Sequence, residues 1–118
     1  MSDADTTVET LRESTRAFVA EREWEKFHTP KNLAMSLAIE AAELMEHFQW
    51  LEPAESHATA NVPATKAAIA DELADVLCYA LSLANVLQID VSNAVLGKLE
   101  KNALKYPAER FRGRYRAD

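Results

Sequence analysis

The positions of the prolines restrict the fold of this 118-residue chain more than any other feature. The sequence contains only 2 glycines and 4 prolines, and the prolines stand at positions 30, 53, 63 and 107. Proline is accepted at the first position of a helix but breaks a helix interior. No segment between the prolines alternates apolar and polar residues as a strand does. The sequence therefore predicts an all-α fold.

Capping signals place four main helices. Thr6 and Glu9 have the spacing of a capping box, Thr29 precedes Pro30 as an N-cap, and Asp90 is placed to cap the last helix. A helix is expected to end before a proline that follows it. The expected helices run from about residue 7 to the low twenties, from 30 to about 51, from 63 to about 87, and from 90 to just before 107, with a loop at 53–63.

The length predicts one domain over residues 1–118, with a basic C-terminal tail from about residue 108. Four helices with short connections favour a helical bundle. The second and third helices are apolar over wide arcs, and one short chain has few partners to cover both. We therefore expect oligomerisation, as a dimer or a homotetramer, to complete the bundle.

Composition also restricts the partners and the location. Cys78 is the lone cysteine, no secretory signal opens the sequence, and no apolar run reaches the ~20 residues that span a bilayer. We expect a cytoplasmic protein that binds no membrane. The net charge is −10 over residues 1–97 and +4 over residues 98–118. An overall net charge of −6 argues against stable nucleic-acid binding.

Acidic pairs border the apolar faces of the second and third helices. Glu40 and Glu43 are three residues apart on one helix, and Glu72 and Asp75 repeat this spacing on the other. If the borders meet, carboxylates about 5 Å apart repel by about 3 kcal/mol per pair at an effective dielectric near 20, and a hard divalent cation such as Mg²⁺ must separate them. The alternative is a solvated acidic surface, and the pattern alone leaves both open.

The four acids, spaced ExxE, then 28 residues, then ExxD, resemble the signature of the MazG-like, all-α nucleoside triphosphate pyrophosphohydrolases. Further segments resemble the dCTP pyrophosphatase branch of that superfamily, and they lie at residues 22–33, 48–50, 72–81 and 95–107. The resemblance implies a Mg²⁺-dependent enzyme that cleanses the nucleotide pool. It would convert dCTP, or a modified dCTP, to dCMP and pyrophosphate.

The resemblance also implies which residues act. The metal ligands would be Glu40, Glu43, Glu72 and Asp75, and Glu40 or Glu43 would be the catalytic group that activates water. The implied base-binding residues are Trp24, His28, Asn32, Trp50 and Tyr79. The implied phosphate-binding residues are Lys98, Asn102 and Tyr106, with Lys105 undecided.

A non-catalytic function is the alternative hypothesis. In that case the chain is a helical oligomerisation or adaptor module whose acidic residues only keep its surface hydrated. Such a module would gain no stability from Mg²⁺ and nucleotide, whereas an enzyme that binds both in its folded state would.

Overall fold

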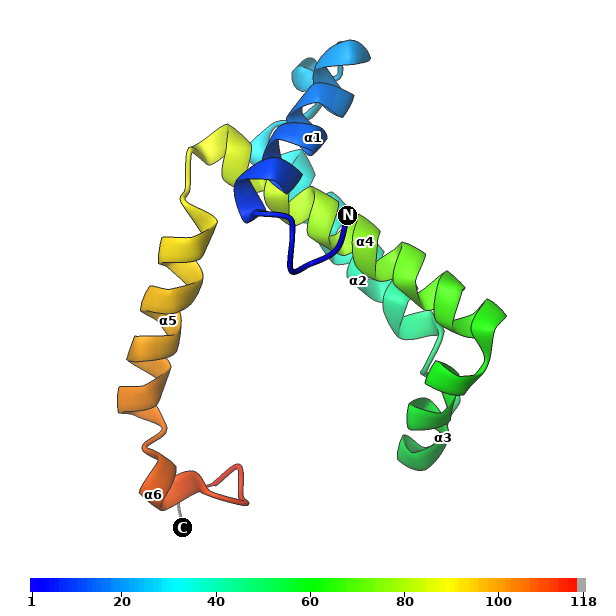
Figure 1. Cartoon of the computed structure of the whole chain (residues 1–118), viewed down its shortest axis with the longest axis vertical. Coiled ribbons are helices and arrows are strands. Elements are labelled where there is room, and N and C mark those ends of the chain that lie inside the picture. Colours follow the sequence, from blue (N-terminus) through cyan, green and yellow to red (C-terminus); the bar gives the residue numbers. More distant parts are fainter. Residues whose placement is uncertain (117–118) are drawn as a thin grey trace. The chain divides into compact units, whose positions relative to one another are not determined.

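The computed structural model describes residues 1–116 and is all-helical, with no strand in that range (Figure 1). The predicted all-α fold is confirmed, while the last two residues of the predicted basic tail, 117–118, lie outside the described residues. The helices are α1 (Val8–Glu21), α2 (Pro30–Glu46), α3 (Pro53–Ala58), α4 (Pro63–Leu87), α5 (Val91–Lys105) and α6 (Ala108–Phe111), with 3₁₀ turns η1 (Glu25–Phe27) and η2 (Thr59–Asn61).

Side-chain caps begin three of these helices. The hydroxyls of Thr7 and Thr29 and the carboxylate of Asp90 each accept a hydrogen bond from the backbone N–H three residues later, at 3.1, 3.1 and 2.8 Å. Each bond satisfies one of the free N–H groups of a first turn. The expected caps at Thr29 and Asp90 are confirmed. The cap of α1 is Thr7, so the expected capping box of Thr6 with Glu9 is wrong by one residue.

Two expectations for the middle of the chain are corrected. Helix α2 ends at Glu46, before the expected end near residue 51, and turns follow it. The segment expected as a loop at 53–63 contains α3 and η2. Pro53 is the first residue of α3, and the Glu52 N–H donates to Glu55 Oε1 at 3.1 Å. Local capping therefore stabilises a short helix where proline was read only as a stop signal.

The chain divides into two compact units, residues 1–88 and 89–118. In the first unit, α2 packs along α4, and α1 also contacts α4 (Figure 1). Leu33 of α2 is 1% exposed and is the largest fully buried side chain. In the second unit, which holds α5 and α6, the Tyr106 and Phe111 rings meet edge to face at 5.2 Å. The expected single domain over residues 1–118 stays a prediction.

Asn85, near the end of α4, fixes α1 in the first unit. Its Oδ1 accepts hydrogen bonds from Arg12 Nε at 2.9 Å and Arg16 Nη2 at 3.1 Å, and its Nδ2 donates to the Arg12 carbonyl at 3.2 Å. One amide side chain thus holds two successive turns of α1 against α4.

None of the helices in residues 1–116 combines the length and the apolar composition that a membrane crossing requires.

Candidate functional site

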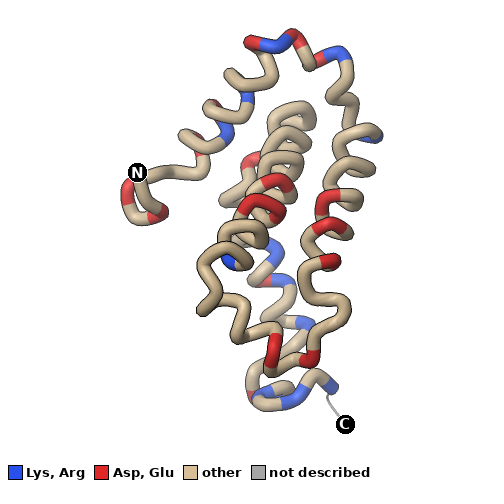
Figure 2. Tube along the Cα trace, turned by 90° about the vertical axis from the view of Figure 1, so that its right-hand side faces the viewer, with Lys and Arg blue, Asp and Glu red and all other residues tan. Residues whose placement is uncertain are grey.

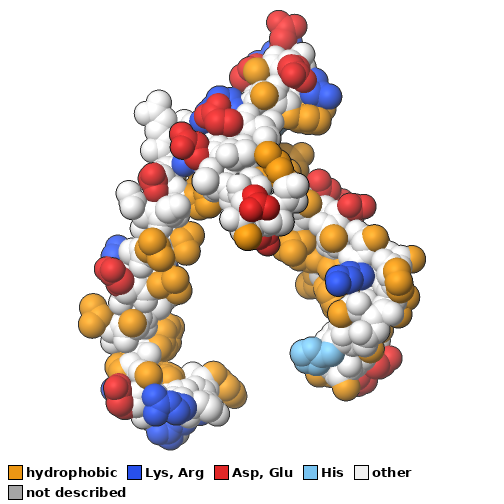
Figure 3. Space-filling model, in the orientation of Figure 1, with side chains coloured by type: hydrophobic (Ala, Val, Ile, Leu, Met, Phe, Trp, Pro, Cys, Tyr) orange, Lys and Arg blue, Asp and Glu red, His pale blue; other side chains and the backbone are white. Residues whose placement is uncertain are grey.

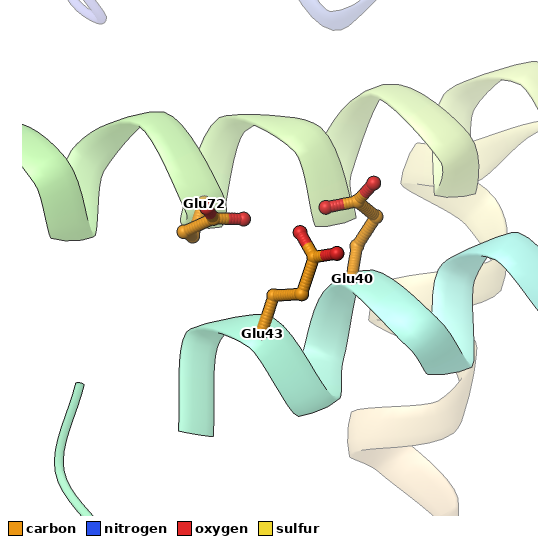
Figure 4. A group of neighbouring side chains, drawn as sticks. All are labelled: Glu40, Glu43 and Glu72. Atoms are coloured by element: carbon orange, nitrogen blue, oxygen red, sulfur yellow. The ribbon is translucent and has the colours of Figure 1, made fainter. Parts of the chain in front are cut away.

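Carboxylates from α2 and α4 meet where these helices run side by side. Glu40 and Glu43 extend from α2 toward α4, and Glu72 extends from α4 toward them (Figure 4). One carboxylate oxygen from each lies within 4.8 Å of the others. Figure 2 shows Asp and Glu residues, in red, along two neighbouring helices. The expected meeting of the two acidic borders is therefore present for these three side chains.

Burial makes this cluster unusual for glutamates. The Oε2 atoms of Glu40 and Glu72 are buried and have no hydrogen-bond partner within the described chain. The pKa of Glu40 is raised to about 7. The main cause is burial, followed by the adjacent Glu43 carboxyl and then by the charges of Asp75 and Glu72. Burial and then the charge of Glu43 also raise the pKa of Glu72. A carboxylate that loses water without gaining a partner is held in an unfavourable environment.

Asp75 joins the cluster electrostatically. It lies one turn after Glu72 on α4, and its charge contributes to the raised pKa of both Glu40 and Glu72. It does not belong to the trio whose oxygens lie within 4.8 Å. Asp75 instead lines a cavity between α1 and α4. It therefore connects the carboxylate cluster with the space beside it.

The donor set fits a hard divalent cation. Carboxylate oxygens are the preferred ligands of Mg²⁺, and two buried oxygens of this cluster have no hydrogen-bond partner among residues 1–116. A cation among these side chains would offset both their mutual repulsion and their loss of hydration.

The cavity beside Asp75 has a volume of about 610 Å³, within the range of small-molecule sites. Its walls are mostly apolar, with a few polar groups. Trp24 meets Phe18 edge to face at 5.9 Å, and the rings of His28 and Tyr79 lie 6.5 Å apart. The lining residues are Leu11, Ser14, Thr15, Phe18, Val19, Trp24, His28, Ala74, Asp75, Leu77, Cys78, Tyr79, Leu81 and Ser82.

Three of the five expected base-binding residues line this cavity, namely Trp24, His28 and Tyr79. The other two do not. The Asn32 side chain donates to the backbone carbonyl of Phe27 at 3.1 Å, and Trp50 is 87% exposed. The aromatic wall thus forms within one unit, and the assignments of Asn32 and Trp50 stay predictions.

Sequence reasoning missed the cavity residues of α1 and the end of α4, among them Thr15, Phe18 and Ser82. A weak signal existed for Thr15. It lies between Leu11 and Phe18 at spacings of four and three residues, so it is a polar residue within an apolar helical stripe.

The expected phosphate-binding residues belong to the second unit. Lys98 and Asn102 are one turn apart on α5, and Tyr106 follows the last helical residue. Lys98 and Tyr106 are exposed, and Asn102 is half-buried. Their role stays a prediction.

A comparison with protein families identifies the chain. The model of the MazG-like family matches residues 35–115, which include the four acids and the whole of α4 and α5. The chain belongs to the MazG-like family. This confirms the resemblance drawn from the spacing of the acids.

Similar proteins include members with named activities. The MazG-like chain is 42% identical over 107 residues to dCTP pyrophosphatase 1 of Rattus norvegicus, which covers 91% of the chain and 63% of that relative. It is also 42% identical over 102 residues to dCTP pyrophosphatase 1 of Homo sapiens, covering 86% of the chain and 60% of that relative. The chain therefore spans less than two thirds of the length of these relatives.

A solved structure matches nearly end to end. The crystal structure of a pyrophosphatase from Archaeoglobus fulgidus DSM 4304 superposes with a TM-score of 0.78 and 41% identity, covering 91% of this chain and 98% of that one. The fold described above is thus shared with that pyrophosphatase structure over almost the whole chain.

Proposed function

We propose that this protein is a Mg²⁺-dependent nucleoside triphosphate pyrophosphohydrolase that converts dCTP, or a modified dCTP, to dCMP and pyrophosphate and so cleanses the nucleotide pool. The observation that carries the proposal is the position of Asp75, which acts on the carboxylate cluster and also lines the aromatic cavity. This arrangement allows one ligand to place its phosphates at the acids and its base among the rings. The relatives named dCTP pyrophosphatase 1 support cytosine as the base.

The acidic residues would hold the metal and the attacking water. Glu40, Glu43, Glu72 and Asp75 are the proposed Mg²⁺ ligands. When bound, Mg²⁺ neutralises charge on the triphosphate and lowers the pKa of water. In the proposed reaction a water oxygen bonds to the α-phosphorus, the bond from that phosphorus to the bridging oxygen breaks, and pyrophosphate leaves. Glu40 or Glu43 orients the water and accepts its proton at a carboxylate oxygen.

The cavity would hold the nucleobase. Trp24, His28 and Tyr79 offer ring faces, and stacking of a base on an aromatic side chain is typically worth about 1–3 kcal/mol. The amide of Asn32 and the exposed ring of Trp50 are proposed as additional base contacts. The proposed contacts to the β- and γ-phosphates are Lys98, Asn102 and Tyr106. The positive charge of the lysine would offset the negative charge of the phosphates.

A panel of nucleoside triphosphates tests the function. Purified protein incubated with Mg²⁺ should release pyrophosphate and dCMP from dCTP, and chelation of the metal should stop the release. Glu43→Gln should lower kcat by at least about a hundredfold, because it removes the charge of a proposed metal ligand. The fold should persist, because the substitution removes no core volume. A melting temperature of the metal-free variant that is no lower than that of the wild type would show that the loss is chemical and not a loss of folding.

The same assay separates the alternatives. Release of orthophosphate without pyrophosphate would show that a different bond is cleaved. A wild-type protein that hydrolyses none of the triphosphates, and gains no thermal stability from Mg²⁺ with nucleotide, would instead favour the non-catalytic helical module.

We also propose that the protein is a homo-oligomer, a dimer or a tetramer, in the cytoplasm. Apolar side chains are widely exposed within each unit, as the orange surfaces along α5 and along the α2–α4 pair show in Figure 3. Only Leu33 and Ala84 are buried apolar residues within the described chain. Exposed apolar surface on this scale marks an interface. The free thiol of Cys78 is compatible with a reducing compartment.

A further inference from the structure

Thr15 occupies a particular position in the cavity wall. It lies on α1, which faces the cavity with the apolar side chains of Leu11, Phe18 and Val19. Thr15 is half-buried, and Ser14, the other hydroxyl residue that α1 contributes to the wall, is exposed. Thr15 is therefore the half-buried hydroxyl that this helix offers to a ligand.

The hydrogen bond of Thr15 determines what it can offer. Its Oγ1 donates to the backbone carbonyl of Leu11, one turn earlier, at 2.9 Å. A hydroxyl has one proton and two acceptor lone pairs, so a threonine that donates to its own helix keeps only acceptor capacity. A ligand group facing Thr15 gains a hydrogen bond if it carries an N–H, and gains none if it carries a carbonyl.

We propose that Thr15 selects the base by accepting a hydrogen bond from an exocyclic amino group, such as the 4-amino group of cytosine. This inference rests on the proposed nucleotide hydrolysis and adds a specificity-determining residue to it. Uracil and thymine carry a carbonyl at the same ring position. To donate to that carbonyl, Thr15 must release its bond to Leu11, so the exchange yields no net hydrogen bond.

Ser82, across the cavity from α1, does not distinguish these bases at position 2. Ser82 of α4 lines the same cavity and is 6% exposed. Its hydroxyl can donate to a ring carbonyl, but cytosine and uracil share the carbonyl at position 2. Position 4 can be distinguished by a hydroxyl that has no free proton, which is the state of Thr15 in α1.

Two variants test the proposal through a ratio of substrates. Thr15→Val keeps the branched shape and removes the hydroxyl, whereas Thr15→Ser keeps the hydroxyl. Kcat/KM should be measured for dCTP and dUTP. We expect Thr15→Val to lower the value for dCTP by roughly tenfold and to change that for dUTP by less than about twofold. Thr15→Ser should keep the wild-type ratio, and general damage to the fold would lower both values together.

A binding measurement needs no metal and no turnover. The rise in melting temperature should be larger with dCMP than with dUMP for the wild type, and equal for Thr15→Val. A dCTP to dUTP ratio that is unchanged in Thr15→Val, or lost equally in Thr15→Ser, overturns the role of Thr15. A wild type that hydrolyses no triphosphate overturns the proposed function itself, so the two failures are distinguishable.

Discussion

Glu40 is the residue whose environment departs most from that of a free side chain. Its carboxyl is partly buried beside Glu43 and Glu72, and one of its oxygens has no hydrogen-bond partner in the described chain. Its pKa is raised from the ordinary value of 4.5 to about 7, mainly by burial. In the metal-free protein, such a site destabilises the fold when its carboxyls ionise.

This environment predicts an inverse dependence of stability on pH. The folded-state pKa of Glu40, about 7, lies above its ordinary 4.5, so between these values the folded protein binds more protons than the unfolded chain. The contribution to stability is fully present below pH 4.5 and is lost as the pH rises through 7. The ionisation of Glu40 should therefore lower the melting temperature of the metal-free protein as the pH is raised from 5 to 8.

Glu40→Gln is the matched control for the pH experiment, because glutamine has nearly the same shape and does not titrate. Its melting temperature should change less over the same pH range. Mg²⁺ should stabilise the wild type more at pH 8 than at pH 6, since metal ligands must be deprotonated. Identical pH profiles of wild type and Glu40→Gln would contradict the assigned environment.

Among single residues, the sequence predicted the acids better than the cavity. Periodicity places Glu40 and Glu43 on one border of a helix, and the need to bury the adjacent apolar face turns that border toward the partner helix. The position of Thr15 depends instead on how α1 crosses α4. That crossing is set by packing and by the bonds of Asn85, and local spacing does not contain it.

At the scale of elements, α1 is a wall of the cavity, and the Asn85 side chain of α4 hydrogen-bonds two of its turns. Asn85→Ala removes the hydrogen bonds to Arg12 and Arg16 and should lower the free energy of unfolding by about 1–3 kcal/mol. Because Thr15 and Phe18 lie on α1, KM for dCTP should rise more than kcat falls. Asn93→Ala, at an exposed position on α5, is the matched control. It should leave the free energy of unfolding and the KM for dCTP unchanged.

The same elements show where local signals suffice. The long helix α4 begins at Pro63 and ends at Leu87 as expected, because proline and a long apolar stripe determine its course. Helix α3 was missed because Pro53 was read as the end of one helix. It is also the start of another, since the glutamates on either side of it form a capping box. A proline in a short acidic segment can thus follow the end of one helix or begin the next, and only the backbone structure distinguishes these outcomes.

At the scale of the whole molecule, the amount of exposed apolar surface is the dominant feature. Ile39 on α2 is 59% exposed and Leu99 on α5 is 57% exposed, and each has apolar neighbours on its own helix. A stable domain normally hides such faces. The sequence predicted exposed apolar faces for α2 and α4 from their wide apolar arcs, and it did not predict the exposed apolar face of α5. The number of subunits depends on the geometry between copies, which no single-chain pattern encodes.

A charge placed on one of these faces tests the assembly. The wild type should have a solution mass of two or four times the 13.2 kDa subunit, measured by light scattering after size exclusion. Leu99→Glu should shift the mass toward 13.2 kDa, because an unpaired carboxylate in an apolar interface is costly to bury. Lys101→Glu, at an exposed position two residues along α5, introduces the same side chain and should leave the mass unchanged.

Circular dichroism should confirm that both variants stay helical, and Ile39→Glu repeats the test on α2. A wild type of 13.2 kDa, or full assembly in both leucine and isoleucine variants, would show that these faces are not subunit contacts.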